Sequence, residues 1–284
     1  MTKEQILEKM KFDLESRGLS QCTVEDYMVK VKFYQDHFEK PADQMGENEI
    51  LAYQHYLLNE KKLKPSTVNT YNSALRFVYC VTLDSPLNTK RVPQVKHIRS
   101  LPILPTKEEL RYLFYLAEDN LRNKALFMTM YGAGLRLGEA ANLKVSDIDS
   151  DKGRIFIRKG KGGRDRYALL SKKALEALRA YWVDTQPKDW LFVTKKGTKM
   201  TEKSIQDAWK SIVRRSGIPK RINVHLLRHC FAVHMLDEGN DIFAIKNLLG
   251  HVSINSTMWY LQMNDSKTLK LKSPLDNMKE RGNA

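Results

Sequence analysis

Residues 88–105 divide the chain into two parts and so limit the folds that it can adopt. The stretch NTKRVPQVKHIRSLPILP contains three prolines, no acidic residue and the basic residues Lys90, Arg91, Lys96 and Arg99. Its prolines and its lack of hydrophobic periodicity are typical of a linker, and its charge suggests that it lies along a polyanion. Thr106, with Glu109 three residues later, predicts the capped start of a new helix. Since 284 residues also exceed a usual single core, we expect domains at 1–87 and 106–284.

The first part of the chain has helical periodicity throughout. Apolar and aromatic residues recur at helical spacing over about 3–17, 23–38 and 48–60, and a fourth helix is expected to begin near Pro65. Four short helices predict a small bundle in which no catalytic pattern is visible. The exposed faces of this bundle and its exit carry basic residues that could contact phosphates: Lys64, Arg76, Lys90 and Arg91. For each of them alone, an ordinary solvated surface residue is the simpler interpretation.

The charge of the chain points to a polyanionic partner. Lys and Arg number 48 against 33 Asp and Glu, which gives a formal net charge of +15 and a pI near 9.6. Such an excess in a folded protein is typical of nucleic-acid binding, although a basic surface that only aids solubility is the ordinary alternative. The 42% hydrophobic content is enough for packed cores, so a disordered chain is excluded.

Neither membrane insertion nor secretion is expected. No apolar run approaches the ~20 residues of a membrane-spanning helix, and the N-terminus is a charged amphipathic helix without an apolar signal core. The cysteines Cys22, Cys80 and Cys230 have no paired spacing. We therefore expect reduced thiols in a cytoplasmic protein.

The second part mixes helices with a basic β-hairpin. An apolar helix ends at the glycines of YGAG, and this break exposes Arg136 near Glu139; a purely structural ion pair would have the same pattern. Strands are expected at 154–158 and 165–170 around a glycine-rich turn. The basic residues of this hairpin are Arg158, Lys159, Lys161, Arg164 and Arg166. Glycines allow such a tip to approach a DNA backbone closely, although an exposed hairpin without a function would look alike.

The rest of this part is expected to be largely helical. Helices are predicted near 172–184 and 201–215, with a short strand over 190–194 between them. The P-loop pattern GxxxxGK[ST] is absent from the sequence, so the hairpin is not expected to hold a nucleotide triphosphate.

Residues 225–260 gather chemically active side chains. The members of the group are His225, Arg228, His251 and Tyr260. Positions three apart share one face of a helix, so His225 and Arg228 can point at the same ligand. A zinc site on His225 and His229 is disfavoured because Arg228 between them repels a cation, and no metal is expected. We interpret His229 and His234 as structural. The G-x-S-x-G pattern of serine hydrolases is absent.

These residues fit phosphoryl transfer to a tyrosine. Attack on a DNA phosphodiester builds charge on the non-bridging oxygens, which the guanidinium forks of Arg136 and Arg228 match. A phenol has a pKa of about 10, so its ionisation near pH 7 costs about 4 kcal/mol, and His225 or His251 could accept the proton. Lys161 could protonate the leaving 5′-oxygen. A tyrosyl phosphate conserves the bond energy, so rejoining would need neither ATP nor a metal.

The whole set resembles the tyrosine recombinase (phage integrase) family. The residues that carry the likeness are Arg136 in G-L-R-x-G-E, Lys161, the run H-x-L-R-H-x-F-A-x-H-x-L from His225, Leu249-Gly250-His251, and Tyr260 nine residues later. The likeness spans essentially the whole chain and is greatest to the Xer-like or simple integrase branch. One departure is Ser256-Thr-Met-Trp-Tyr-Leu-Gln-Met, where the commoner pattern is Thr-Thr-x-x-Tyr-x-His. The family histidine after the tyrosine is therefore missing, which weakens an assignment to a strict Xer housekeeping role.

The resemblance implies a fold and a role for each residue. It implies a mainly α protein, with a helical core-binding domain at 1–87, a basic linker at 88–105, and an α+β catalytic domain at 106–284 that holds a small β-hairpin or sheet. The implied roles are phosphate binding by Arg136 and Arg228, general acid catalysis by Lys161, general base catalysis by His225, phosphate support by His251, and nucleophilic attack by Tyr260. Arg158, Lys159 and Arg164 join the expected DNA contacts.

The resemblance also implies partners. Family members act as tetramers on double-stranded DNA through a Holliday junction, with a C-terminal segment docked on a neighbour, which would here begin at about 266. The resemblance further implies an enzyme that needs no cofactor and that acts in the cytoplasm at the nucleoid. Two alternatives remain: a catalytically silent DNA-binding or architectural protein, whose mark would be loss of a catalytic residue, and a type IB topoisomerase, which would relax plasmids that carry no recombination site.

Overall fold

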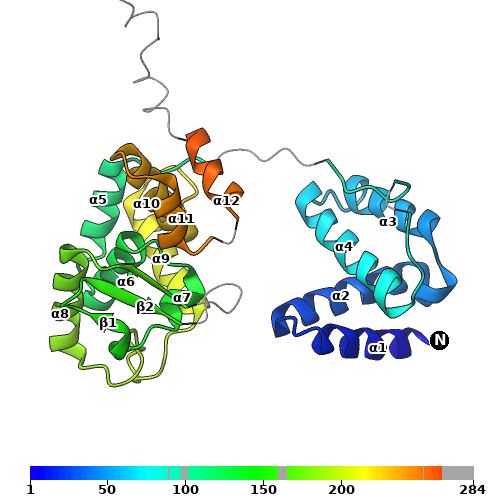
Figure 1. Ribbon diagram of the computed structural model, residues 1–284, viewed down its shortest axis with the longest axis horizontal. Coiled ribbons are helices and arrows are strands. Elements are labelled where there is room, and N and C mark those ends of the chain that lie inside the picture. Colours follow the sequence, from blue (N-terminus) through cyan, green and yellow to red (C-terminus); the bar gives the residue numbers. More distant parts are fainter. Residues whose placement is uncertain (89, 97–101, 159–164, 252, 264–284) are drawn as a thin grey trace, which may run out of the picture. The chain divides into compact units, whose positions relative to one another are not determined.

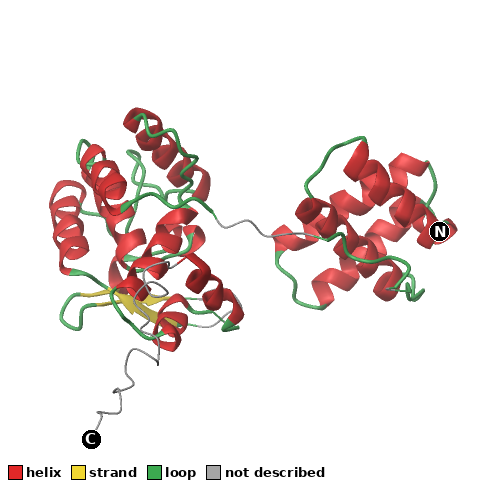
Figure 2. Ribbon diagram, turned by 90° about the horizontal axis from the view of Figure 1, so that it is seen from above, coloured by secondary structure: helices red, strands yellow, loops and turns green. Residues whose placement is uncertain are grey.

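The computed structural model describes residues 1–88, 90–96, 102–158, 165–251 and 253–263. The chain forms two compact units, Met1–Ser100 and Leu101–Ala284. The described residues are mostly helical, and their strands lie in the second unit alone (Figure 2). This confirms the predicted fold class.

The first unit is a bundle of four helices (Figure 1). They are α1 (Lys3–Ser16), α2 (Gln21–Phe38), α3 (Glu47–Asn59) and α4 (Pro65–Phe77), with a 3-10 turn η1 (Ala42–Gln44) and a π-helical turn η2 (Val78–Thr82). The sequence sets the starts of these helices: Thr2 and Gln5 form a capping box, the Ser20 hydroxyl accepts from Thr23, and Pro65 occupies the first turn of α4. The expected helices are confirmed, with ends within two residues of those predicted.

The core of the bundle contains polar atoms that satisfy one another. The hydroxyls of the buried Tyr34 and Tyr79 lie 3.1 Å apart, and Tyr79 donates to the Ala42 carbonyl at 2.9 Å. Burial raises the pKa of Tyr79 to about 12, so both phenols stay neutral and act only as hydrogen-bonding groups. We assign no chemistry to this core.

The second unit combines helices with a small sheet. Its helices are α5 (Lys107–Leu116), α6 (Leu121–Gly132), α7 (Leu137–Ala141), α8 (Lys172–Thr185), α9 (Glu202–Ser216), α10 (His225–Asp237), α11 (Ile242–Leu249) and α12 (Asn255–Met258), with 3-10 turns η3 (Val145–Asp147) and η4 (Trp259–Met263). The capping box that Thr106 and Glu109 predict for α5 is present.

The sheet of the second unit is antiparallel, with the strand order β1-β2-β3. The strands are β1 (Ile148–Asp149), β2 (Arg154–Ile157) and β3 (Arg166–Leu169). Ile157 pairs with Arg166, which confirms the hairpin; its turn at 159–164 lies outside the described residues. The strand expected over 190–194 is wrong. That segment makes only isolated bridges, from Trp190 to Lys144 and from Val193 to Lys199, so its backbone bonds go to separate partners rather than along one strand.

Two apolar clusters support the second unit. The larger surrounds the buried Trp209, whose ring lies 4.8 Å from that of Phe127. The smaller joins α10, α11 and η4 and includes Phe231, Leu249 and Tyr260. The smaller cluster therefore holds the elements that carry the candidate residues of 225–260. Within the described part of the chain, no helix is both long and apolar enough to cross a membrane.

Candidate active site

Arg228 is the buried arginine of the site. It lies on α10 with 6% of its surface exposed, and it donates from Nη1 to the Gly134 carbonyl and from Nη2 to the Leu249 carbonyl, each at 2.7 Å. Burial, and then the charge of Arg136, lower its pKa to about 10, so it remains a cation near neutral pH. Arg228 thus ties α10 to the helix break after α6 and to the end of α11.

Arg136 lies directly after that helix break, at the N-cap position of α7. The break depends on Gly134, which has φ +60°, and whose added Cβ would lie 2.6 Å from the Phe231 ring. Only glycine fits such a position without strain. The Arg136 side chain is 24% exposed, and it donates from Nη1 to Glu139 at 2.8 Å and from Nη2 to the Gly250 carbonyl at 3.3 Å.

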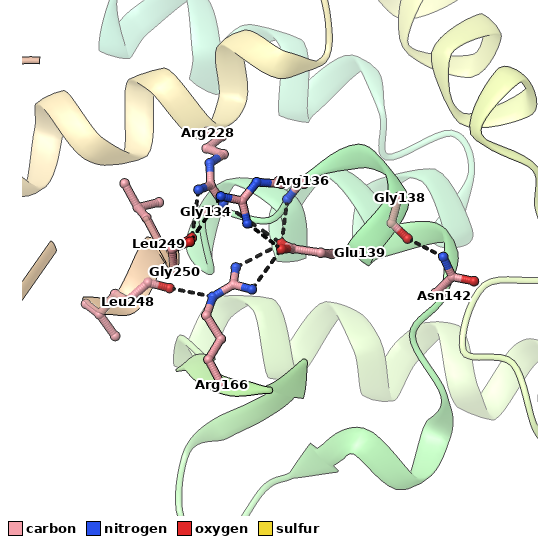
Figure 3. Close-up of polar contacts among 10 residues, drawn as sticks. All are labelled: Gly134, Arg136, Gly138, Glu139, Asn142, Arg166, Arg228, Leu248, Leu249 and Gly250. Carbon is pink, nitrogen blue, oxygen red and sulfur yellow. Dashed lines mark hydrogen bonds and ion pairs between the residues drawn. The ribbon is translucent and has the colours of Figure 1, made fainter. Parts of the chain in front are cut away.

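Glu139 is the carboxylate between three arginines (Figure 3). Arg166 contacts both of its oxygens at 2.8 Å, Arg136 contacts it from side chain and backbone at 2.8 Å, and Arg228 Nη1 lies 3.9 Å away. Burial raises the pKa of Glu139, but the hydrogen bonds and charges of Arg166 and Arg136 outweigh it and bring the pKa to about 2. One buried anion against three cations leaves the site positive, as an anionic substrate requires.

Tyr260 lies in η4 against two imidazoles. It is 3% exposed, its hydroxyl is 3.0 Å from Nδ1 of His229, and its ring stacks on that of His251 with centroids 6.2 Å apart. Burial raises the pKa of the phenol, while the charges of Arg228 and Arg136 oppose that rise. The tyrosine therefore lies within the positive field of both arginines.

Both imidazoles favour the neutral form. Burial first, and then the charge of Arg228, lower the pKa of His229 and that of His251 to about 4. Nδ1 of His251 lies 2.8 Å from the hydroxyl of the buried Thr257. Each ring can accept a proton or a hydrogen bond at neutral pH. Among the described residues, no group of three or more His, Cys, Asp or Glu is arranged to hold a metal ion.

Comparison with known proteins identifies the family. Residues 104–267 match the model of the "Phage integrase family", and residues 6–89 match "Phage integrase, N-terminal SAM-like domain". A relative from Sinorhizobium fredii, described as an integrase/recombinase (y4qK), is 37% identical over 95% of this chain and 88% of its own. "Tyrosine recombinase XerA" of Pyrococcus horikoshii is 33% identical over 91% of this chain and 89% of its own. This chain belongs to the phage integrase family of tyrosine recombinases.

Solved structures agree with this family at the level of the fold. "Crystal structure of XerA recombinase" is 25% identical with a TM-score of 0.57 and covers 96% of this chain and all of its own. A lambda integrase dimer bound to a COC' core site has a TM-score of 0.75 at 18% identity, over 96% of this chain and 80% of its own. The family models and the sequence relatives confirm the predicted family, function and enzyme class, those of a tyrosine recombinase that acts in DNA recombination.

In this family member, four predicted site residues form one group. Arg136 directly precedes α7, Arg228 lies on α10, His251 follows α11 and Tyr260 lies in η4. Arg136 and Arg228 meet at the Glu139 carboxylate and bond the carbonyls of 250 and 249, and the Tyr260 ring stacks on that of His251. His225 is exposed at the first residue of α10. Lys161, Lys159 and Arg164 lie outside the described residues.

Sequence reasoning missed two contacts of this site. It interpreted His229 as structural and did not predict that Nδ1 of this residue lies 3.0 Å from the Tyr260 hydroxyl. It also gave Arg166 no role beyond the charge of the hairpin, although Arg166 binds Glu139 bidentately. The sequence contained a partial signal for the Arg166–Glu139 pair, because an acidic residue follows Arg136 closely. It did not identify Arg166, 27 residues later, as the partner of Glu139. His234, by contrast, contacts the hydroxyl of Tyr131 at 2.8 Å.

The arginines among the expected DNA contacts that the structure describes have side-chain partners inside the chain. Arg158 pairs with the buried Asp147 at 2.7 Å, with half of its side chain exposed. In the first unit, Arg76 donates to the Val92 carbonyl at 2.7 Å, and Arg91 pairs with Glu47 at 3.1 Å. Lys90 is exposed. These intramolecular bonds leave the charges of Arg158 and Arg91 partly exposed to solvent.

Proposed function

We propose that this chain is a site-specific recombinase that cleaves and rejoins double-stranded DNA through a 3′-phosphotyrosine and a Holliday junction. The observation that carries the proposal is that the Tyr260 ring stacks on His251, next to the carbonyls of 249 and 250 that accept from Arg228 and Arg136, so that the phenol lies in the positive field of both arginines. A buried tyrosine with only a packing role needs no such field. In a family member, the phenol in this field is the natural nucleophile.

The arginines would bind the scissile phosphate. A guanidinium has five N–H donors, and the two donors of Arg136 that are used inside the site leave its 24% exposed side chain able to reach an anion. The transition state places additional charge on the non-bridging oxygens, and preorganised arginines in a site that excludes water stabilise it more than the ground state. Arg228, almost fully buried, would set the depth at which the phosphate binds.

The covalent step needs two proton transfers. The Tyr260 oxygen attacks phosphorus as the bond to the 5′-oxygen breaks, so the phenol loses a proton and the leaving oxygen gains one. We assign the acceptor to His225 and the donor to Lys161 from the family pattern, with His251 supporting the phosphate. In the described structure it is His229 that contacts the hydroxyl at 3.0 Å. The reverse reaction, attack by a 5′-hydroxyl on the tyrosyl phosphate, restores the phosphodiester without another energy source.

The proposal extends to assembly on DNA. Residues 1–87 would form a DNA-binding domain and 106–284 the catalytic domain, so that both units and the basic segment 88–105 hold one duplex. Phosphate contacts are assigned to Arg76, Lys90, Arg91, Arg158, Lys159 and Arg164. Lambda integrase has been solved as a dimer on a core site and as a tetramer on a Holliday junction, and we infer the same assembly here, with the segment after about 266 docking on a neighbouring copy. Such an enzyme would act in the cytoplasm at the nucleoid.

A selection for covalent adducts tests this proposal and finds the target sequence in the same experiment. The substrate is a library of duplexes with random sequence and a nick in one strand, so that cleavage just before the nick releases a short fragment with a 5′-hydroxyl. Loss of this fragment prevents rejoining and traps the protein on the DNA. Wild-type protein should enrich one family of sequences with inverted repeats, and Tyr260→Phe should yield no adduct. An adduct that survives Tyr260→Phe would contradict the assignment of the nucleophile. Wild-type adducts spread evenly over all sequences, with relaxation of any plasmid, would instead support the topoisomerase alternative.

A further inference from the structure

Arg166 is a largely buried cation of the site, and each of its three guanidinium nitrogens donates a hydrogen bond. It is the first residue of β3, its side chain is 10% exposed, and all three guanidinium nitrogens donate: Nη1 and Nη2 to the two oxygens of Glu139 at 2.8 Å each, and Nε to the Leu248 carbonyl at 2.9 Å. Bidentate pairs of this kind fix orientation as well as supplying energy. Arg166 is therefore held in one orientation and is turned away from solvent.

The partners of Arg166 are the groups that hold the phosphate-binding candidates. Glu139, fixed on one side by Arg166, holds the Arg136 guanidinium and backbone N–H on the other (Figure 3). Leu248, fixed at its carbonyl, begins the turn whose next two carbonyls accept from Arg228 and Arg136. A shift of Arg166 would move both sets of contacts.

Close packing strengthens this link. Gly250 has φ +64°, and an added Cβ there would lie 2.7 Å from Cδ and 3.0 Å from Nε of Arg166. The backbone of the turn before His251 thus lies directly on the Arg166 side chain. The sheet, α7 and the end of α11 meet at this one residue, although they are distant in sequence.

Charge balance argues against a purely neutralising role. Arg136 and Arg228 already surround Glu139 with two positive charges, one at 2.8 Å and one at 3.9 Å, so a third is not needed to offset the carboxylate. A third buried cation raises the cost of burying Arg228, whose pKa the charge of Arg166 lowers further. The place of Arg166 in the site is better explained by the geometry of its contacts.

We propose that Arg166 is a positioning residue for DNA cleavage, which sets Arg136 and the turn before His251 at the scissile phosphate through Glu139 and the Leu248 carbonyl. The inference rests on the proposed recombinase function. Because Arg166 acts through Arg136 and does not touch DNA, its loss should slow the covalent step and leave DNA affinity unchanged. A misplacement of about 1 Å in such a site can cost on the order of 100-fold in rate.

A double-mutant cycle on the selected duplex tests the inference. Arg166→Lys keeps the positive charge but loses the bidentate geometry of the guanidinium. Arg136→Lys makes the same change at the arginine that is proposed to bind the phosphate. The measured quantities are the dissociation constant for uncleaved duplex and the single-turnover rate constant of adduct formation, which does not depend on the fraction of active molecules. Arg154→Lys is the matched control. Arg154 lies on the neighbouring strand β2, and its Nε bonds the Asp149 carboxylate at a distance of 2.9 Å, outside the site.

The expected result is a rate constant for Arg166→Lys lowered by roughly 10- to 100-fold, with wild-type affinity and a wild-type rate for the control. In the Arg136→Lys background, Arg166→Lys should change the rate by less than about twofold, because residues that act as a unit are not additive. Independent, multiplicative losses, or a wild-type rate for Arg166→Lys, would overturn the inference. If the wild type itself forms no Tyr260-dependent adduct, it is the proposed function that fails.

Discussion

Glu139 should contribute stability whose pH dependence can be calculated from its pKa. Its pKa falls from an ordinary 4.5 to about 2 because Arg166 and Arg136 outweigh burial. At about 1.4 kcal/mol per pKa unit, the ionised carboxylate stabilises the second unit by about 3 kcal/mol. Because the folded pKa is the lower one, this stability is fully present above pH 4.5 and is lost as the pH falls through 2; about 2 kcal/mol of it is gone by pH 3.

Glu139→Gln removes the titrating group and keeps nearly the same volume. Urea unfolding followed by tryptophan fluorescence isolates the relevant unit, because the four tryptophans, Trp182, Trp190, Trp209 and Trp259, all belong to Leu101–Ala284. At pH 6 the variant should be about 3 kcal/mol less stable than the wild type, and this difference should shrink by about 2 kcal/mol at pH 3.

The control for this experiment is Asp149→Asn. Asp149 also pairs with an arginine, but on the surface, where solvent screens the interaction and such pairs contribute little. A stability difference between Glu139→Gln and wild type that is the same at pH 6 and pH 3 would refute the pairing of Glu139 as the cause of its low pKa. So would a Glu139→Gln protein as stable as the wild type at pH 6.

Two further predictions concern the same site. Gly250→Ala forces a side chain into a left-handed conformation against Arg166, so it should destabilise the second unit by about 1–3 kcal/mol in urea unfolding and slow adduct formation; a wild-type rate would contradict the close packing. The pKa values of His229 and His251 are lowered to about 4, so stability should be complete above pH 6.5 and fall between pH 6.5 and 4. His229→Gln should make that fall shallower, and an unchanged slope would show that His229 does not titrate there.

The regular elements of this protein follow from local sequence. Periodic apolar residues and the capping groups at Thr2, Ser20 and Thr106 are local signals, and they determined the helices and their starts. The hairpin followed from alternation. The prediction of a strand over 190–194 failed because an apolar run does not reveal whether its backbone bonds go to one neighbouring strand or to several segments. Here Trp190 bridges Lys144 and Val193 bridges Lys199.

Motifs predicted which residues belong to the site, but they did not predict the hydrogen bonds that join these residues. Spacing within one helix or turn brought His225, Arg228 and His251 into consideration. Tyr260 was included because it lies in the same stretch, and the family resemblance then implied its role as the nucleophile. The bond from Arg166 to Glu139 joins two elements that pack in the larger cluster, and the bond from His229 to Tyr260 joins two elements that pack in the smaller one. Nothing in a single sequence specifies which arginine of a basic hairpin turns inward.

The central claim is that Tyr260 becomes bonded to a DNA 3′-phosphate. Protease digestion of the trapped adduct followed by mass spectrometry locates the modified residue, and a kinase that labels only free 5′-hydroxyls reports the other DNA end. The expected result is a nucleotide on Tyr260 and a 5′-hydroxyl that can be labelled without phosphatase treatment. A nucleotide on any other residue, or a 5′-phosphate at the break, would contradict the claim.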